Sequence, residues 1–185
     1  MNRLASPAQL RASFTRWALF WVPAVLLLGR LSGWASGSAA EDPWFVALDK
    51  PAIFPPPVTF GIVWPILYVL MGFAIAIVCA AWGSRYRTPA ILAFVLQLAV
   101  NLAWSPVFFA MHRIKEALIV IGVLDVLVIV TIVLFWRVRR VAALLLLPYL
   151  AWIAFATLLN WEFLQANPDG GREGTANGAV QRYEF

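Results

Sequence analysis

Long apolar stretches separated by short polar connections follow one another from residue 14 to residue 164. A helix needs about 20 mostly apolar residues to cross the hydrocarbon core of a bilayer. The pattern therefore predicts five membrane-spanning helices, over residues 14–34, 58–82, 89–110, 114–136 and 141–164. The expected fold class is an all-α membrane protein, built as a bundle of five transmembrane helices.

The chain divides into three parts on the same pattern. Residues 1–16 form a basic N-terminal tail, residues 17–165 the five-helix membrane domain, and residues 166–185 a Gly-rich polar tail that we expect to be flexible. The connection over residues 35–57 is longer than the others and ends in three successive prolines. Such a run cannot continue a helix and favours an extended path.

The first apolar stretch admits a second interpretation. Arg3, Arg11 and Arg16 precede a short apolar core, and Ser38-Ala39-Ala40 resembles a small-residue cleavage site. The stretch would then be a signal peptide, and four helices would remain. The Trp-rich core and the apolar residues that resume past Arg30 favour a retained helix.

Composition excludes an ordinary soluble enzyme, a disordered chain and a disulfide scaffold. Apolar residues make up 63% and charged residues 12% of the 185 residues, against roughly 45–50% and roughly 25% in soluble proteins. Cys79 is the only cysteine and His112 the only histidine, so the residues predict no metal site. No nucleophile–base pair, paired carboxylates or phosphate loop is visible, and the residues therefore predict no enzyme.

The net charge of +5 points to a membrane surface rather than to nucleic acid, because the basic residues are scattered. With five spans, eight basic residues fall on the side of the N-terminus and six on the other. Basic loops face the cytoplasm. We therefore expect a cytoplasmic N-terminus and an outward-facing Pro-rich first loop.

The third span has two unlike faces at about 100° per residue. A polar and aromatic face carries Gln97, Asn101, Trp104, Ser105 and Phe108, and the opposite face carries Ala99, Ala103 and Ala110. We expect the first face to point into the bundle and the small residues to form a dimer interface. In the alternative, the polar pair merely joins helices and the alanines pack inside the monomer.

Two further spans carry aromatic faces of the same kind. Trp64, Tyr68 and Met71 align in the second span, and Pro148, Trp152, Phe155, Ala156 and Leu159 align in the fifth, with Asn160 at the edge. Three such faces predict a flat apolar cavity with a few polar anchors, as ligand pockets are generally built. Aromatic core packing is the alternative.

Asp125 lies in the middle of the fourth span. A carboxylate there costs about 2.5–3.5 kcal/mol on insertion scales, so it should face the interior and be paired or protonated. Its role is either functional or a structural hydrogen bond to another helix. His112, in a loop beside Arg113, is expected to be a solvated surface group.

Three motifs in order carry a family resemblance. They are Leu48-Asp49-Lys50-Pro51 with Phe60-Gly61-Ile62-Val63-Trp64 and Tyr68; Gln97-Leu98, Asn101 and Trp104-Ser105-Pro106-Val107-Phe108-Phe109; and Leu147-Pro148-Tyr149-Leu150-Ala151-Trp152 with Phe155-Ala156-Thr157. They resemble the first loop and the second, third and fifth helices of the TspO/MBR family, the tryptophan-rich sensory proteins related to the mitochondrial translocator protein. The resemblance covers residues 44–167.

The resemblance implies a five-helix protein of a bacterial membrane, commonly dimeric, with a pocket near the first loop. The family binds tetrapyrroles such as protoporphyrin IX, and also sterols, in sensing, regulation or transport; no permanent cofactor is required. The pocket positions carried over are Trp64, Tyr68, Asn101, Trp104, Phe108, Trp152, Phe155 and Ala156, under a covering loop with Trp44, Lys50 and Pro51. Lys50 and Asn101 are expected to anchor propionates.

The chain also departs from the family pattern. Ile53 and Val58 stand where the family often has Trp, and Asp125 occupies another position where Trp is frequent. A loop Trp has been linked to light-driven porphyrin degradation, so that enzymatic activity is kept only as the alternative function. Trp161 and Glu162 follow Asn160, so the vertebrate cholesterol pattern is not carried over.

Overall fold

The computed structural model describes residues 7–37 and 42–169. This part of the chain is helical and contains no strand. The elements are α1 (Pro7–Ala35), α2 (Pro43–Ala47), α3 (Pro57–Ala80), α4 (Arg87–Ser105), the π-helical turn η1 (Pro106–Ala110), α5 (Ile114–Val138), α6 (Arg140–Leu144) and α7 (Leu147–Ala166). Five spans are long and apolar enough to cross a membrane, with α4–η1 and α6–α7 each forming one, which confirms the predicted fold class.

Helix boundaries agree with the sequence prediction to within a few residues except at the N-terminus. Helix α1 already begins at Pro7, so residues 7–16, which we assigned to the tail, are helical. The cleavage site of the signal-peptide interpretation, Ser38–Ala40, lies outside the described residues. So do residues 1–6 and the tail from residue 170 onwards.

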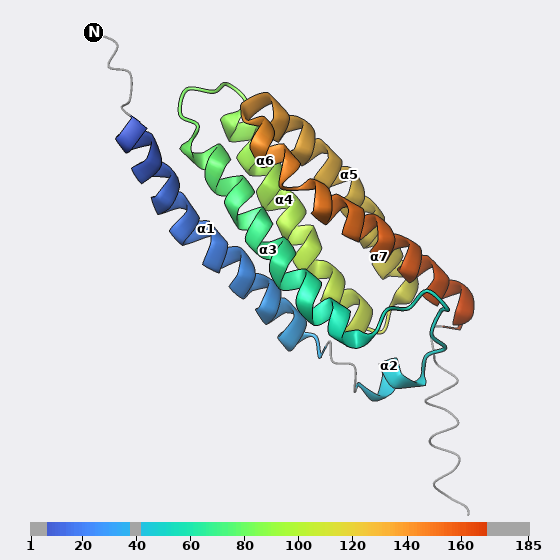
Figure 1. The fold of residues 1–185 in the computed structure, drawn as a ribbon. Helices are drawn as coiled ribbons and strands as arrows, with labels where there is room; N and C mark the ends of the chain where they lie inside the picture. The colour runs from blue at the N-terminus through green and yellow to red at the C-terminus, as the bar shows by residue number, and fades with distance from the viewer. Residues whose placement is uncertain (1–6, 38–41, 170–185) are drawn as a thin grey trace, which may run out of the picture.

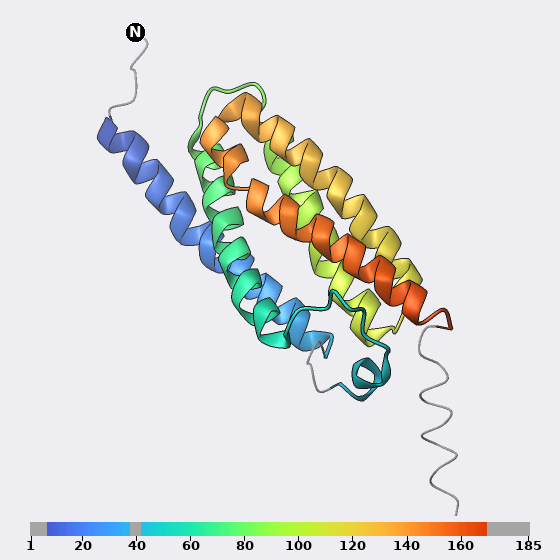
Figure 2. The same ribbon diagram turned by 45° about the vertical axis from the view of Figure 1, so that its right-hand side comes forward.

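The helices pack as neighbours in a bundle with a covering segment at one end. Helix α1 lies along α3, α4 packs on α5, and α5 packs on α7 (Figures 1 and 2). The short helix α2 and its loop lie at the end opposite the N-terminus of α1 (Figure 1). This arrangement leaves the ends of α3, α4 and α7 beneath the covering loop.

Two glycines allow α1 and α3 to approach closely. A Cβ atom at Gly72 would lie 2.6 Å from the Cα atom of Val22, and one at Gly29 would lie 2.1 Å from the ring of Tyr68. The first contact is with backbone, which cannot rotate away. Close approach through small residues is the usual basis of helix association in membranes, where apolar burial gives no driving force.

Pro106 begins the π turn and explains a contact between α1 and α4. Proline has no backbone N–H, so it leaves the carbonyl of Leu102, four residues earlier, without its helical partner. The hydroxyl of Ser32 on α1 donates to this carbonyl at 2.6 Å. One turn further along, the hydroxyls of Ser36 and Ser105 lie 2.7 Å apart. A break in one helix is thus satisfied by a neighbouring helix.

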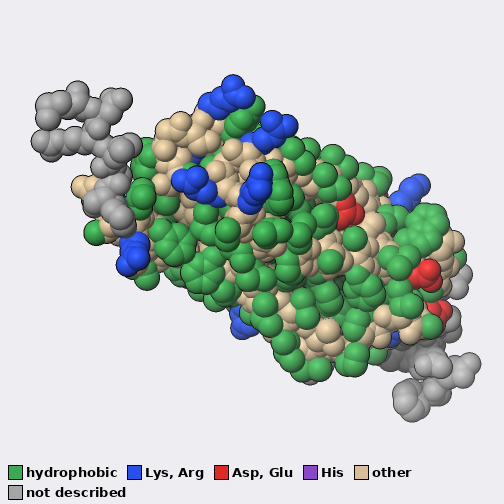
Figure 3. All heavy atoms as spheres, turned by 45° about the horizontal axis from the view of Figure 1, so that its top comes forward, with side chains coloured by type: hydrophobic (Ala, Val, Ile, Leu, Met, Phe, Trp, Pro, Cys, Tyr) green, Lys and Arg blue, Asp and Glu red, His purple; other side chains and the backbone are tan. Residues whose placement is uncertain are grey.

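Charge is divided between the two ends of the bundle. The end that holds the start of α1, the α3–α4 loop and the α5–α6 junction carries Arg11, Arg16, Arg85, Arg87, Arg137, Arg139 and Arg140. Asp42, Asp49, Glu116, Glu162 and Asp169 all belong to the segments of the other end, which also carry Arg30, Lys50, Arg113 and Lys115. Figure 3 shows basic side chains gathered toward one end and hydrophobic atoms over the middle of the molecule.

We expect Gly72→Ala to lower the free energy of unfolding by about 1–3 kcal/mol, because the new methyl group must push α1 away from α3. Gly122→Ala is the matched control, since a Cβ atom there meets nothing within 4 Å. That control should be neutral or stabilise by up to about 1 kcal/mol. Unfolding titrations with sodium dodecyl sulfate, followed by circular dichroism, measure both variants, and equal losses would contradict the close-approach argument.

Candidate functional site

A chain of hydrogen bonds joins three helices in the centre of the bundle. The hydroxyl of Tyr68 on α3 donates to Oδ1 of Asn101 on α4 at 3.3 Å. Asn101 Nδ2 donates to the hydroxyl of Tyr149 on α7 at 3.0 Å, and Tyr149 donates to Oε1 of Gln97 at 3.1 Å. All four side chains are buried. The predicted polar face of the third span therefore does point inward.

A second polar contact lies nearer the covering loop. The indole N–H of Trp104 donates to Oδ1 of Asn160 on α7 at 3.1 Å. Asn160 Nδ2 donates to the carbonyl of Ile114, the first residue of α5, at 3.0 Å. Asn160 thus ties the end of α4 and the start of α5 to α7. Ser105, which we expected on the same face as Trp104, instead contacts α1 through Ser36.

An aromatic cluster occupies the space between these helix ends and the loop. We use this name for the rings of Trp44, Phe45, Phe54, Phe60, Trp104, Phe108, Phe109 and Phe163. Neighbouring ring centroids lie between 4.9 and 6.5 Å apart, in the range typical of favourable ring contacts. Among the contacts, Trp104 stacks on Phe108 at 5.2 Å and Trp44 meets Phe108 edge to face at 5.7 Å.

The covering loop is held by its own polar contacts. Asp42 caps α2 by accepting from the backbone N–H of Phe45 at 2.9 Å. The ammonium group of Lys50 donates to the carbonyls of Phe45, Val46 and Leu48 at 2.7, 2.8 and 3.0 Å, so its three protons are all engaged. Burial lowers the pKa of Lys50, and the nearby Asp49 carboxylate offsets part of this effect. Lys50 therefore binds the backbone carbonyls at the C-terminal end of α2 and does not point into the helix bundle.

A clasp joins the loop to the C-terminal end of α7. The backbone N–H of Asp49 donates to Oδ1 of Asn167 at 2.9 Å, and Asn167 Nδ2 donates to the carbonyl of Asp49 at 2.9 Å. Asn167 Nδ2 also donates to the carbonyl of Phe163 at 3.0 Å. Asp49 and Asn167 are 118 positions apart in the chain. The clasp therefore fixes the loop over the aromatic cluster.

The structure brings the predicted pocket residues together in two groups. Tyr68 and Asn101 belong to the central polar chain, and Trp64 stacks on Tyr68 at 5.3 Å. Trp44, Trp104 and Phe108 belong to the aromatic cluster. The remaining residues lie beside these groups: Trp152 contacts Phe60 and Phe155, Ala156 packs on the core, and Pro51 accepts from the N–H of Phe54 in a turn.

Three rings that we did not predict as pocket residues lie beneath the covering loop. Phe45, Phe54 and Phe163 contact one another there. Phe163 could have been found, since it continues the face of Trp152 by helical spacing. Phe45 and Phe54 lie on a short helix and a turn, where no periodicity marks the inward side.

Asp125 and His112 both have partners that the sequence did not identify. The hydroxyl of Thr157 on α7 donates to Oδ2 of Asp125 at 2.7 Å, which matches the structural alternative of an interhelical hydrogen bond. His112 is exposed but stacks on Trp44 at 4.3 Å between centroids. Its φ of 55° is left-handed, which is uncommon for a residue with a side chain.

Ala99, Ala103 and Ala110 all lie exposed on the outside of the bundle. The alternative that they pack inside the monomer is therefore wrong for the described structure. The π turn carries extra residues per turn, so Ala110 is rotated away from the row that an unbroken α-helix would form with Ala103.

No group of three or more His, Cys, Asp or Glu side chains within residues 7–37 and 42–169 could hold a metal ion.

The comparisons with known proteins agree with one another on the family. The model of the TspO/MBR family matches residues 20–165. The chain is similar to "Tryptophan-rich protein TspO" of Chlorobaculum tepidum, with 36% identity over 74% of this chain and 89% of the relative. It is also similar to "Tryptophan-rich sensory protein" of Cereibacter sphaeroides, with 38% identity over 68% and 78%. Human "Translocator protein" is 37% identical over 64% of this chain and 71% of the relative.

We expect Asn101→Leu to lower the free energy of unfolding by about 1–3 kcal/mol, because it leaves the buried hydroxyl of Tyr68 without its acceptor and removes one of the two hydrogen bonds of Tyr149. Combined with Tyr68→Phe in a double-mutant cycle, it should show a coupling energy of about 0.5–1.5 kcal/mol, the range of interhelical hydrogen bonds in membranes. The measurement is unfolding in mixed micelles.

Thr131→Val provides the control for this cycle. Thr131 is equally buried, but its hydroxyl donates to the carbonyl of Leu127 in its own helix. It should show no coupling to Tyr68→Phe. If Asn101→Leu and Tyr68→Phe are additive within about 0.3 kcal/mol, the polar chain does not link α3 to α4 energetically.

Proposed function

This chain belongs to the TspO/MBR family of membrane proteins, and from this premise we propose that it binds flat hydrophobic molecules within the bundle, tetrapyrroles such as protoporphyrin IX first and sterols second. The aromatic cluster beneath the covering loop is the observation that carries the proposal. Stacked and edge-on rings offer a flat guest a large apolar contact area. The central polar chain lies directly behind them and supplies polar anchors.

Binding within the aromatic cluster requires its rings to rearrange, because they contact one another. The covering loop contributes Phe45 and Phe54 to the cluster, and it is held to α7 by the clasp between Asp49 and Asn167. A guest therefore enters when the clasp opens and these two rings move aside. The rings that remain on α4 and α7 then form the walls.

Two buried donors are suited to the polar groups of such a guest. The indole N–H of Trp152 and the side-chain amide N–H groups of Gln97 are buried and have no acceptor within the described part of the chain. A buried donor without a partner is costly, and an acceptor on a ligand would relieve that cost. A carboxylate or carbonyl of the guest is the matching group. Lys50 contributes by holding the loop rather than by pairing with propionates.

The proposed role is sensing, regulation or transport rather than catalysis. Ile53 and Val58 replace the aromatic residues often found at these positions in the family, and both are exposed aliphatic side chains outside the aromatic cluster. No ring stands there to react with an excited porphyrin, which disfavours light- or oxygen-dependent degradation as the alternative. We place the protein in a bacterial membrane with its N-terminus and its Arg-rich end in the cytoplasm, as the distribution of basic residues favours.

Titration with protoporphyrin IX should quench tryptophan fluorescence saturably. We expect Trp152→Ala to weaken binding about tenfold, since it removes both a ring surface and a buried donor. Asn101→Ala should weaken it about threefold or more by loosening the polar chain. Trp136→Ala is the control, because Trp136 is a half-exposed ring at the opposite end of the bundle. Quenching that all three variants leave unchanged would reject the site.

The same complex tests the alternative function. Under illumination, the bound porphyrin should bleach no faster than it does in detergent alone. Rapid loss in proportion to the amount of protein would instead establish a degradative activity.

We also propose a homodimer through the exposed alanine face of α4, with Ala99 and Ala103 at its centre and Ala110 at its edge. Close packing of small residues favours such helix pairs. Ala103→Leu should reduce cross-linked dimer in mild detergent by about fivefold or more. Ala154→Leu, an equally exposed alanine on α7, is the control. A dimer that survives Ala103→Leu unchanged would place the interface on another face.

A further inference from the structure

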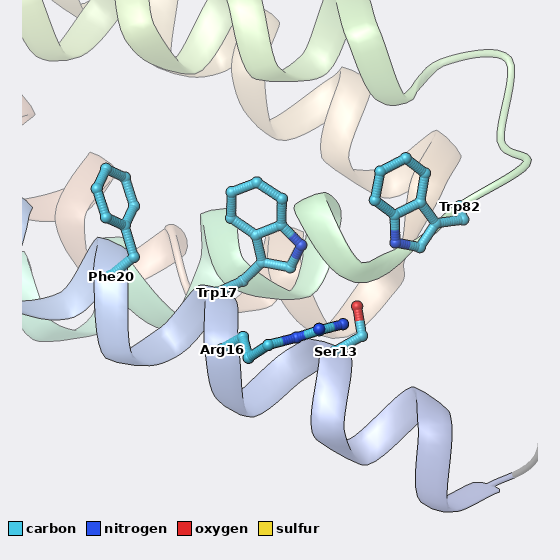
Figure 4. Close-up of a pocket in the computed structure, with 5 residues that line it drawn as sticks. All are labelled: Ser13, Arg16, Trp17, Phe20 and Trp82. Atoms are coloured by element: carbon cyan, nitrogen blue, oxygen red, sulfur yellow. The ribbon is translucent and has the colours of Figure 1, made fainter.

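A hollow lies at the end of the bundle away from the aromatic cluster. It has a volume of about 270 Å³ and is lined by Ser13, Arg16, Trp17 and Phe20 of α1 and by Trp82, which follows α3 (Figure 4). One part of its lining is polar and the rest is aromatic. In Figure 4 the Ser13 hydroxyl and the Arg16 guanidinium lie below the Trp82 ring, and Trp17 and Phe20 follow along α1.

The polar part of the hollow has two donors for which the described residues supply no acceptor. Ser13 is only 6% exposed, and its hydroxyl has no hydrogen-bond partner within the described residues. Arg16 is exposed and pairs with no carboxylate there, since the ion pair found in this part of the chain joins Arg113 and Glu116 at the other end. A buried hydroxyl without a partner is costly, so its presence beside a guanidinium that no described carboxylate pairs with points to an anionic ligand.

The length of α1 places this hollow at the bilayer surface. The helix has 29 residues and is therefore about 43 Å long, well beyond the roughly 30 Å of a hydrocarbon core. Trp17 and Trp34 are separated by about 26 Å of helix, which suits the two aromatic belts of a membrane. Ser13 and Arg16 then lie at the level of the lipid headgroups, while Phe20 reaches the acyl chains.

Further cations surround the hollow, and some are held in place. The guanidinium of Arg87 lies 4.1 Å from the centroid of the Trp82 ring, and its Nε donates to the carbonyl of Cys79 at 3.0 Å. Arg137 lies 5.9 Å from the ring of Tyr86 in the adjoining loop. The described segments of this end carry no acidic side chain. The local field therefore favours a ligand with net negative charge.

We propose that this hollow is a binding site for one anionic phospholipid. The headgroup phosphate accepts hydrogen bonds from the Ser13 hydroxyl and the Arg16 guanidinium, while one acyl chain lies along the Trp17 and Phe20 rings of α1. This site is separate from the tetrapyrrole site proposed above and does not depend on it. Charge complementarity and the amphipathic lining together identify the occupant as a lipid rather than a soluble anion.

Native mass spectrometry of the full-length protein in detergent tests this proposal, with added phosphatidylglycerol compared with phosphatidylcholine of the same chains. We expect one retained phosphatidylglycerol and weaker retention of phosphatidylcholine. Arg16→Gln should reduce phosphatidylglycerol affinity about fivefold, the effect of one basic residue near an anionic headgroup, and reduce phosphatidylcholine affinity less, because that lipid has no net charge. Ser13→Ala should reduce it about threefold without altering the fold.

Arg30→Gln is the matched control, because Arg30 is an exposed arginine near the other end of the same helix. It should not change retention. Equal retention of both lipids, or equal losses in Arg16→Gln and Arg30→Gln, would overturn the proposal. Inorganic phosphate forms a third arm: displacement of phosphatidylglycerol by equimolar phosphate would identify a soluble anion as the ligand and also overturn it. Should Arg16→Gln fail to fold by circular dichroism, Ser13→Ala decides the outcome alone.

Discussion

Hydrogen bonds between buried polar side chains hold the centre of this bundle together. Within a bilayer no water is available to a buried amide or hydroxyl, so such a group is stabilised when it finds a partner on its own helix or on a neighbouring one. Asn101 finds partners with both ends of its amide, accepting from Tyr68 and donating to Tyr149. The three side chains position α3, α4 and α7 relative to one another. Because these hydrogen bonds fix the relative positions of the helices, the aromatic rings nearer the loop lie close together.

The sequence predicts much of this fold because membrane spans have a strong and simple pattern. The five spans and the inward direction of Asn101 and Tyr68 follow from length and from a period of 3.6 residues. The π turn at Pro106 does not, because proline permits several local outcomes. The hydrogen bond from Ser32 to the carbonyl of Leu102 cannot be predicted for a different reason. Nothing in the sequence of α1 indicates which distant carbonyl this serine contacts.

The candidate site was predictable where helices build it and unpredictable where the loop does. Trp104, Phe108 and Trp152 follow from helical faces, and the structure places them at or beside the cluster. Lys50 carries a positive charge that could bind an anion, but its ammonium group donates hydrogen bonds to three nearby backbone carbonyls. Such competition between a distant partner and the adjacent backbone cannot be decided from residue types. Asp125 is similar, because its partner Thr157 is visible only once α5 and α7 are packed.

The clasp between Asp49 and Asn167 makes the loop and the last turn of α7 a single mechanical unit. Because the Asn167 side chain contacts the backbone of residue 49 on both its N–H and its carbonyl side, the loop cannot lift as an independent flap. Any outward swing must either carry the tip of α7 with it or sever both bonds at once. Because Asn167 also bonds the carbonyl of Phe163, a movement of the loop is coupled directly to the backbone that carries one of the rings beneath it.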